Sequence, residues 1–381
     1  MTNRTPGHGR AAAPKQKNRK ARLFVKTFLL TLAVCAAALV VAGGVFLATI
    51  KPPEVPALAA AVTESTAAPP DATVTPVNND PAFLPPEGNE EDKAVGGGLT
   101  APAGFTDSDR KDSFYTFVIV GLDGGINTDT IMVASYDAAN KQASIISIPR
   151  DSLVDVKRNV KKINAAYPAG TLNGGGQQGG IAQLKREIKT IIGFTPDYYV
   201  CIDLDAFVKI IDAVGGVDVD VPFAMKYDDP DQNLHIDLQA GFQHLDGLNA
   251  MGFARFRKGD NGVNTVTDYQ RIDNQQTVIK AVLGKLLTPA SIAKIPQFIT
   301  IFSENVTTDL TAQNMLWFAN QIKDIQGTDA LSTYTMPTTG TSGPPSYYEY
   351  LDKPAILDLV NRTINPFTKD ITGSDVDIVG G

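Results

Sequence analysis

The chain has 381 residues, of which 43% are hydrophobic, so it can build one or two domains with a real core. Its formal net charge is −7, but residues 1 to 26 carry eight Lys or Arg and no acidic residue, which leaves −15 for the remainder. An acidic remainder argues against a nucleic-acid-binding domain, because neutralising phosphates requires a broad basic face. Two cysteines are too few for a small disulfide scaffold.

Residues 27 to 50 contain no charge and are numerous enough to cross a bilayer as a helix. Basic residues, including Arg22 and Lys26, precede this stretch, so the positive-inside rule places the tail of residues 1 to 26 in the cytoplasm and the rest outside. A cleaved signal peptide, with a cleavage region at 57 to 61, and a buried core helix are the alternatives. We expect a single-pass anchor in the cell membrane. Because Cys35 lies within it, a disulfide with Cys201 is implausible.

Residues 51 to 112 are rich in Pro, Ala, Thr, Asp and Gly and show neither a helical nor a strand period. This composition is typical of a semi-extended linker. We expect it to hold a folded domain, residues 113 to 381, away from the membrane.

The folded region alternates between strand and helix patterns. Short apolar runs predict strands at 115–123, 131–136, 143–148, 198–204, 217–221 and 331–336. Helical spacing predicts helices at 181–192, 205–216, 246–257, 269–287, 290–302, 311–325 and 353–361. The glycine-rich stretch 170–180 is predicted to be a mobile loop at the rim of a site. This order favours an α/β domain in which a central mixed β-sheet is sandwiched by helices.

The first candidate site group is the strand-end loop GLDGGINTDT at 121–130, which contains Asp123 and Asp129. Two carboxylates on such a loop can share a hard divalent cation, with water and substrate phosphate filling the remaining positions. Aspartates that simply form a turn are the alternative.

The second group is SIPRDS at 147–152, where a strand ends and presents Arg150 and Asp151. A guanidinium grips phosphate oxygens with its rigid fork, and the neighbouring carboxylate is a candidate to orient it. An exposed ion pair of little energetic value is the alternative.

Two further groups follow. ARFRKGD at 254–260 places Arg255 and Arg257 two residues apart, so their joint use requires the helix to end or bend there. TDYQRIDNQQ at 267–276 supplies Asp268 and Arg271, which share one helical face. A helix N-cap is the alternative role for Asp268, and a solvated face is the alternative for the arginines.

The motifs FVIVGLD, TDTIMVASYD, SIPRDSLVDV, KINAAYPAG, VGGVDVDVP, LDGLNAMGFARFRKGD and DYQRIDNQQ follow one another between about residue 114 and residue 287. Together they resemble the LytR-CpsA-Psr family of Gram-positive cell-wall assembly. The resemblance implies a site that binds polyprenyl pyrophosphate with its lipid tail in an apolar tunnel and with Mg2+ at the pyrophosphate. It also implies a phosphotransferase that moves a glycosyl phosphate from this lipid to a hydroxyl of peptidoglycan or another wall acceptor.

The resemblance extends to individual residues. The family's metal-binding aspartates are matched by Asp123 and Asp129. Its phosphate-holding arginines, including that of the PRD motif, are matched by Arg150, Arg255, Arg257 and Arg271. Its acidic residue before the last arginine is matched by Asp268, and either Asp123 or Asp268 is a candidate to accept the hydroxyl proton.

The sequence departs from the family pattern at four positions. Gly124, Asn127 and Asn274 stand where members commonly have arginine, and Thr267 stands in place of a glycine. Fewer positive charges would weaken the grip on pyrophosphate. A non-catalytic binding or regulatory protein of envelope assembly and a pyrophosphatase are therefore the alternatives to a Mg2+-dependent transferase.

Overall fold

The computed structural model describes residues 51–55 and 101–379, apart from 124, 233, 261, 289, 290, 292, 293, 323, 324, 326 and 345. The cytoplasmic tail and the anchor predicted at 27–50 lie outside the described residues. Within the described part, no helix is long and apolar enough to cross a membrane.

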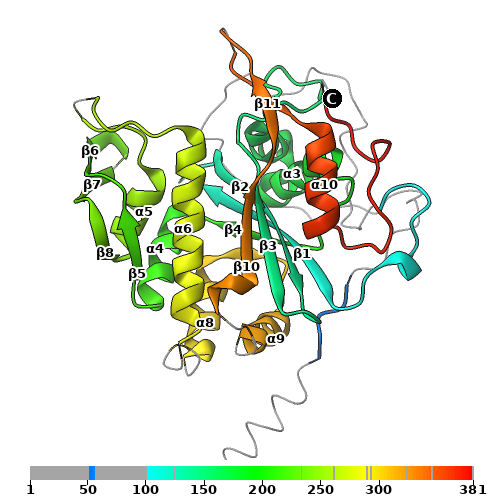
Figure 1. The fold of residues 1–381 in the computed structure, drawn as a ribbon, viewed down its shortest axis with the longest axis horizontal. Helices are drawn as coiled ribbons and strands as arrows, with labels where there is room; N and C mark the ends of the chain where they lie inside the picture. The colour runs from blue at the N-terminus through cyan, green and yellow to red at the C-terminus, as the bar shows by residue number, and fades with distance from the viewer. Residues whose placement is uncertain are drawn as a thin grey trace, which may run out of the picture. The chain divides into compact units, whose positions relative to one another are not determined.

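A six-stranded mixed sheet forms the centre of the unit Pro52–Gly381 (Figure 1). Its strands, in spatial order, are β10 (Leu331–Thr335), β3 (Gln142–Ser147), β2 (Thr128–Asp137), β1 (Phe114–Leu122), β4 (Tyr198–Ile202) and β9 (Thr307–Thr308). β2 is antiparallel to both β1 and β3, whereas β4 runs parallel to β1 and β10 runs parallel to β3. The predicted mixed sheet is confirmed. Its topology brings the ends of β1, β3 and β4 and the start of β2 to one edge.

Helices cover both faces of this sheet (Figure 1). α3 (Gly176–Ile192) and α10 (Lys353–Thr363) bury their apolar stripes against one face, in a core that contains Leu184 and Ile356. On the other face lie α6 (Asp268–Leu286), which contributes Ile279, and α9 (Ala312–Ile322), whose Phe318 ring packs edge-on against Phe117. The predicted sandwich of helices around a sheet is therefore confirmed.

The glycine-rich stretch 170–180 forms a kinked connection between two helices. α2 (Ala166–Gly170) leads through η5 (Thr171–Gly175) into α3, and the backbone departs from helical geometry at Asn173 and Gly174. Gly174 and Gly176 adopt positive φ, which glycine tolerates best. Gly170 serves close packing, because a Cβ there would lie 2.2 Å from the carbonyl oxygen of Gly179.

A second apolar core lies beside the sheet, built by α4 (Leu204–Ala213), α5 (Gly247–Arg255) and two antiparallel strand pairs. The pairs are β5 (Val217–Val221) with β8 (Gly241–Leu245) and β6 (Met225–Asp229) with β7 (Leu234–Leu238). Of these four strands, only β5 was predicted from the sequence. α6 joins this core to the main sheet, since its Val278 packs into the second core while its Ile279 packs against the sheet.

The remaining elements complete the chain. They are α8 (Ile295–Asn305), the hairpin of β11 (Thr338–Thr341) and β12 (Glu349–Leu351), and the 3-10 turns η3 (Asp107–Asp109), η4 (Ile163–Ala165), η6 (Pro230–Gln232) and η7 (Thr328–Ala330).

The boundaries predicted for the linker are wrong at both ends. The Phe105 ring packs 5.0 Å from the Phe367 ring, between centroids, so ordered packing begins before residue 113. At the other end, the Tyr198 hydroxyl donates a 2.8 Å hydrogen bond to the carbonyl oxygen of Glu54. Aromatic contacts and backbone hydrogen bonds thus tie both ends of the predicted linker to the folded unit.

Candidate active site

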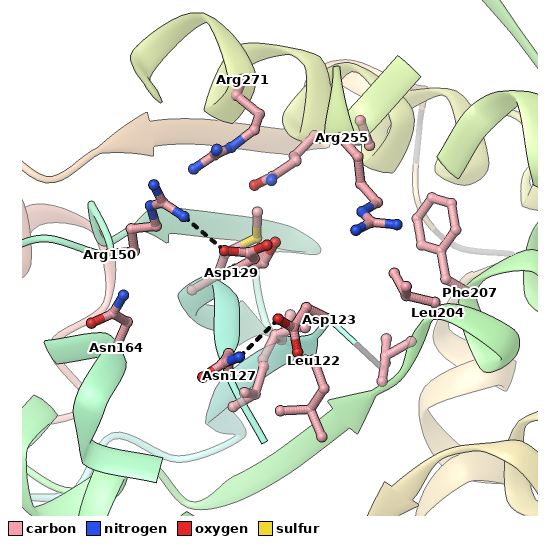
Figure 2. A pocket seen from close by; sticks show the side chains of 18 of the residues that line it. Leu122, Asp123, Asn127, Asp129, Arg150, Asn164, Leu204, Phe207, Arg255 and Arg271 are labelled. Atoms are coloured by element: carbon pink, nitrogen blue, oxygen red, sulfur yellow. Dashed lines mark hydrogen bonds and ion pairs between the residues drawn. The ribbon is translucent and has the colours of Figure 1, made fainter. Parts of the chain in front are cut away.

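The candidate site lies where the central strands end. Asp123 follows β1, Asp129 is the second residue of β2, and Arg150 follows β3. α5 and α6 contribute Arg255 and Arg271 from the opposite side (Figure 2). Residues that are distant in the sequence therefore meet at one sheet edge.

Asp129 holds two of the arginines. Its Oδ1 accepts a 2.9 Å hydrogen bond from Nη1 of Arg150, and Nη2 of Arg257 lies 3.5 Å from the same oxygen. Arg150 is thus oriented by Asp129 and not, as predicted, by Asp151. The carboxylate of Asp151 is instead 3.0 Å from Nζ of Lys162.

Asp268 forms an ion pair with Arg271. The N-cap of α6 is Thr267, whose side chain accepts from the backbone N–H of Gln270 while the Gln270 side chain accepts from that of Thr267. The N-cap alternative for Asp268 was therefore wrong, and Thr267 has a structural role in a capping box. Asp268 Oδ1 lies 2.9 Å from Nη2 of Arg271, and its Oδ2 lies 3.9 Å from Nε of Arg150.

Arg271 is the most buried of these arginines, with 4% of its surface exposed. Burial lowers the pKa of its guanidinium to about 10, with a further contribution from the positive charge of Arg257, while Asp268 acts in the opposite direction. Nε and Nη1 of Arg271 and Nε of Arg150 are buried and have no hydrogen-bond partner among the described residues. Buried donors normally have hydrogen-bond acceptors, and a bound anion would supply acceptors for these nitrogens.

α5 ends at Arg255, and its C-cap Phe256 leaves the helical conformation. The prediction that the helix ends at this motif is therefore confirmed. Because the backbone turns here, Arg255 and Arg257 both line the same cavity despite their separation of two residues. Figure 2 shows Arg255 reaching toward the space between the two loop aspartates.

Asp123 is held by its own loop. Its Oδ2 accepts a 3.0 Å hydrogen bond from the Asn127 side chain, and its Oδ1 accepts one of 3.2 Å from the backbone N–H of Gly125. Asn127, which replaces a common family arginine, thus stabilises the loop. Asn274, at another such position, is buried and donates to the carbonyl oxygen of Phe253, which places it against α5.

The four arginines, Asp123 and Asp129 line a cavity of about 1140 Å³, whereas Asp268 does not. The remaining walls are largely apolar and come from the sheet, α4, α5, α6 and α8; they include Ile119, Met132, Val200, Phe207, Val278 and Phe302. The volume slightly exceeds the roughly 300–1,000 Å³ of pockets for drug-sized ligands. A largely apolar lining with a group of arginines suits a long apolar ligand that has an anionic head group.

Asp123 and Asp129 are the carboxylates predicted to bind Mg2+. Both line the cavity and present oxygen atoms, which this ion prefers. Among the described residues there is no cluster of three or more His, Cys, Asp or Glu side chains that could hold a metal alone.

Sequence reasoning missed several cavity residues, among them Asn159, Lys162, Asn164, Gln275 and Tyr347. Asn164 belongs to the KINAAYPAG motif, and its side chain lies beside Asp129 and Arg150 in Figure 2. That motif was a usable signal, and Gln275 belongs to DYQRIDNQQ. No pattern pointed to Tyr347.

The fold and site together define a class of protein: an α/β domain with an apolar cavity that ends in an arginine cluster suited to phosphates. The LytR_cpsA_psr family model matches residues 89–365, so the chain belongs to this family. The match extends beyond the motifs between residues 114 and 287 on both sides.

Three individual proteins illustrate the similarity. The polyisoprenyl-teichoic acid–peptidoglycan teichoic acid transferase TagV of Bacillus subtilis (strain 168) is 31% identical over 62% of this chain and 59% of its own length. The regulatory protein MsrR of Staphylococcus aureus (strain COL) is 29% identical over 53% of this chain and 58% of its own. The chain thus spans somewhat under three fifths of the length of both relatives. The crystal structure of B. subtilis TagV superposes with a TM-score of 0.54 at 27% identity and covers 67% of this chain and 96% of that one.

Proposed function

We propose that this protein transfers a phosphate-linked glycan from a polyprenyl-diphosphate carrier to a hydroxyl group of the cell wall. The observation that carries the proposal is the set of three buried guanidinium nitrogens, on Arg150 and Arg271, that lack an acceptor among the described residues and belong to side chains lining a largely apolar cavity. A diphosphate would satisfy these donors, and an isoprenoid chain would fill the apolar part. The similarity to TagV, whose name states a teichoic acid transfer to peptidoglycan, supports the same direction of reaction.

The site residues suit phosphoryl transfer, which depends on positioning and on charge neutralisation. The wall hydroxyl attacks the phosphorus that bears the glycan, the bond from this phosphorus to the bridging oxygen breaks, and polyprenyl phosphate leaves. Arg150, Arg255, Arg257 and Arg271 would stabilise the developing negative charge.

Asp123 and Asp129 would hold Mg2+, which supplies further charge neutralisation when bound. The hydroxyl proton would then pass to Asp268, whose Oδ1 pairs with Arg271 while its Oδ2 lies 3.9 Å from Nε of Arg150.

We further propose that the predicted anchor at residues 27–50 keeps the domain at the outer face of the cell membrane. A lipid-linked donor is confined to that surface, so an anchored enzyme meets donor and wall acceptor together. The net negative charge of the chain after residue 26 does not favour nucleic acid as a partner.

The test is a transfer assay with the full-length chain in detergent micelles, a polyprenyl-diphosphate-linked glycan, peptidoglycan fragments and Mg2+. We expect Arg255→Ala and Asp129→Ala each to reduce transfer about 10²- to 10³-fold. Arg362→Ala is the matched control, because this exposed arginine pairs only with Asp358 on α10 among carboxylates and lies outside the cavity.

The assay also separates the alternatives. A wild-type protein that binds the donor but releases neither phosphate nor transferred glycan would be a binding or regulatory protein. Release of phosphate without transfer would identify a pyrophosphatase.

A further inference from the structure

An aromatic segment, residues 346–348, forms part of the rim of the cavity. Its sequence is Ser-Tyr-Tyr, and it leads into β12 from the connection between β11 and β12. Tyr347 is 57% exposed although its neighbour Tyr348 is only partly exposed. An exposed tyrosine is ordinary by itself, but this one borders the charged end of the candidate active site.

Backbone hydrogen bonds fasten this segment to the loop that carries Arg150. The Glu349 N–H donates to the carbonyl oxygen of Asp151, and the Leu153 N–H donates to the carbonyl oxygen of Glu349, both at 2.9 Å. The residues that follow Arg150 and the start of β12 therefore form a continuous hydrogen-bonded unit. The position of Tyr347 is coupled directly to that of the phosphate-binding residue.

The turn before β12 is also held internally. The Ser342 N–H donates to the carbonyl oxygen of Tyr348, and the Tyr348 N–H donates to the Ser342 hydroxyl, each at 2.8 Å. The Ser342 hydroxyl in turn donates to the carbonyl oxygen of Ser346 at 2.7 Å. The backbone on both sides of Tyr347 is thus held by hydrogen bonds, which reduces the backbone ordering that binding would require.

Polar side chains line the cavity together with Tyr347. Lys162 Nζ lies 3.0 Å from Asp151 Oδ1 and 5.8 Å from the centroid of the ring of Tyr348, the residue after Tyr347. Asn159 lines the same cavity. An ammonium, an amide and an aromatic face are the kinds of group that recognise a pyranose, whose hydroxyls need hydrogen-bond partners and whose C–H face packs on an aromatic ring.

We propose that Tyr347, with Asn159 and Lys162, forms a subsite for the donor's sugar residue next to the diphosphate. The inference rests on the proposed function, since a diphosphate at the arginines and a lipid tail in the apolar part leave the rim for the attached glycan. The subsite is assigned to the donor glycan, which is covalently attached to the diphosphate, because these three residues line the same cavity as Arg150 and Arg271.

The test compares two ligands on the full-length chain in detergent micelles: a polyprenyl diphosphate without sugar, and the same lipid diphosphate bearing a short glycan. We expect the wild type to bind the glycan-bearing lipid more tightly. Tyr347→Ala should weaken binding of that lipid about tenfold and leave the sugar-free lipid unaffected. Tyr347→Phe should preserve the preference, because the ring face is retained.

Tyr350→Ala is the matched control, since this tyrosine is also exposed on the same hairpin but does not line the cavity. Equal weakening of both lipids by Tyr347→Ala, or no weakening, would overturn the subsite. An increase in the KM for acceptor alone would overturn its assignment to the donor. If the wild type bound both lipids equally, the proposed function would stand and the subsite would fall; if it bound neither, both would fall.

Discussion

Two buried arginines of this protein, Arg158 and Arg271, have nearly the same exposure, 5% and 4%, but opposite surroundings. Arg158 donates from Nε to the carbonyl oxygen of Val160 and from Nη2 to that of Lys162, each at 2.7 Å, and it forms a two-pronged ion pair with the buried Glu187. Arg271 has one ion pair, with the partly exposed Asp268, and two buried nitrogens without a partner.

The comparison teaches that burial alone does not distinguish a structural arginine from a binding one. Arg158 has acceptors for its guanidinium within the fold, so it holds the segment around residue 160 to α3. Within the described part of the chain, two nitrogens of Arg271 lack acceptors, and this arginine lines the cavity of the candidate site. Arg110 has unpaired buried nitrogens too, but it does not line that cavity and its guanidinium lies over the Phe367 ring at 5.8 Å.

The largest expected effect is on folding. Arg158→Met should lower the free energy of unfolding by about 3–5 kcal/mol, because it leaves the carboxylate of Glu187 buried without its cation. Denaturant titration of the full-length chain measures this change. Adding Glu187→Leu to the variant should restore much of the loss; a single variant as stable as wild type would contradict the structural role of Arg158.

The same substitution at the binding arginine should affect the ligand. Arg271→Met is expected to weaken binding of polyprenyl diphosphate about 10²- to 10³-fold, because it removes the buried donors to the phosphate. Equilibrium binding with Arg362→Met as the control measures it. Unchanged affinity would show that the unpaired nitrogens of Arg271 do not meet the diphosphate.

The pH dependence of binding sharpens the comparison further. Because the pKa of Arg271 is lowered to about 10, the protonated form that binds phosphate persists through neutral pH and is lost as the pH rises above about 10. We expect donor affinity to fall by up to about tenfold per pH unit above that value. Lys162 and Lys258 also line the cavity, so the measurement is the difference between wild type and Arg271→Met. Identical pH profiles for the two proteins would contradict the prediction.

The smallest expected effect is a gain in stability. The folded-state pKa of Arg271 lies below its unfolded value, so the desolvated cation disfavours folding at all pH values below about 10, and this cost diminishes as the pH rises. Arg271→Met should therefore raise the free energy of unfolding at pH 7.5 by roughly 1 kcal/mol in the absence of donor. Thermal unfolding measures it, and a loss of stability would show that Arg271 is structural, as Arg158 is.

Much of the main fold could be predicted because its signals are local. The apolar run of β1, the hairpin of β2 and β3 and the amphipathic spacing of α3 lie within short segments. β7 was missed although its LHIDL alternates between buried and exposed positions, because its partner β6 is polar and the pair is small. The helical parts of the stretch 170–180 were not predicted, because glycine in a sequence is as typical of a loop as of closely packed backbones.

The sequence by itself determined the candidate arginines and aspartates of the site, the end of α5 between Arg255 and Arg257, and the α/β order of strands and helices. Only the tertiary structure decided that Asp129 and not Asp151 orients Arg150, that Arg158 is satisfied while Arg271 is not, and that Tyr347 borders the cavity. The physical reason is that hydrogen bonding and burial depend on groups brought together from distant segments, whereas periodicity and charge are properties of neighbours in the chain.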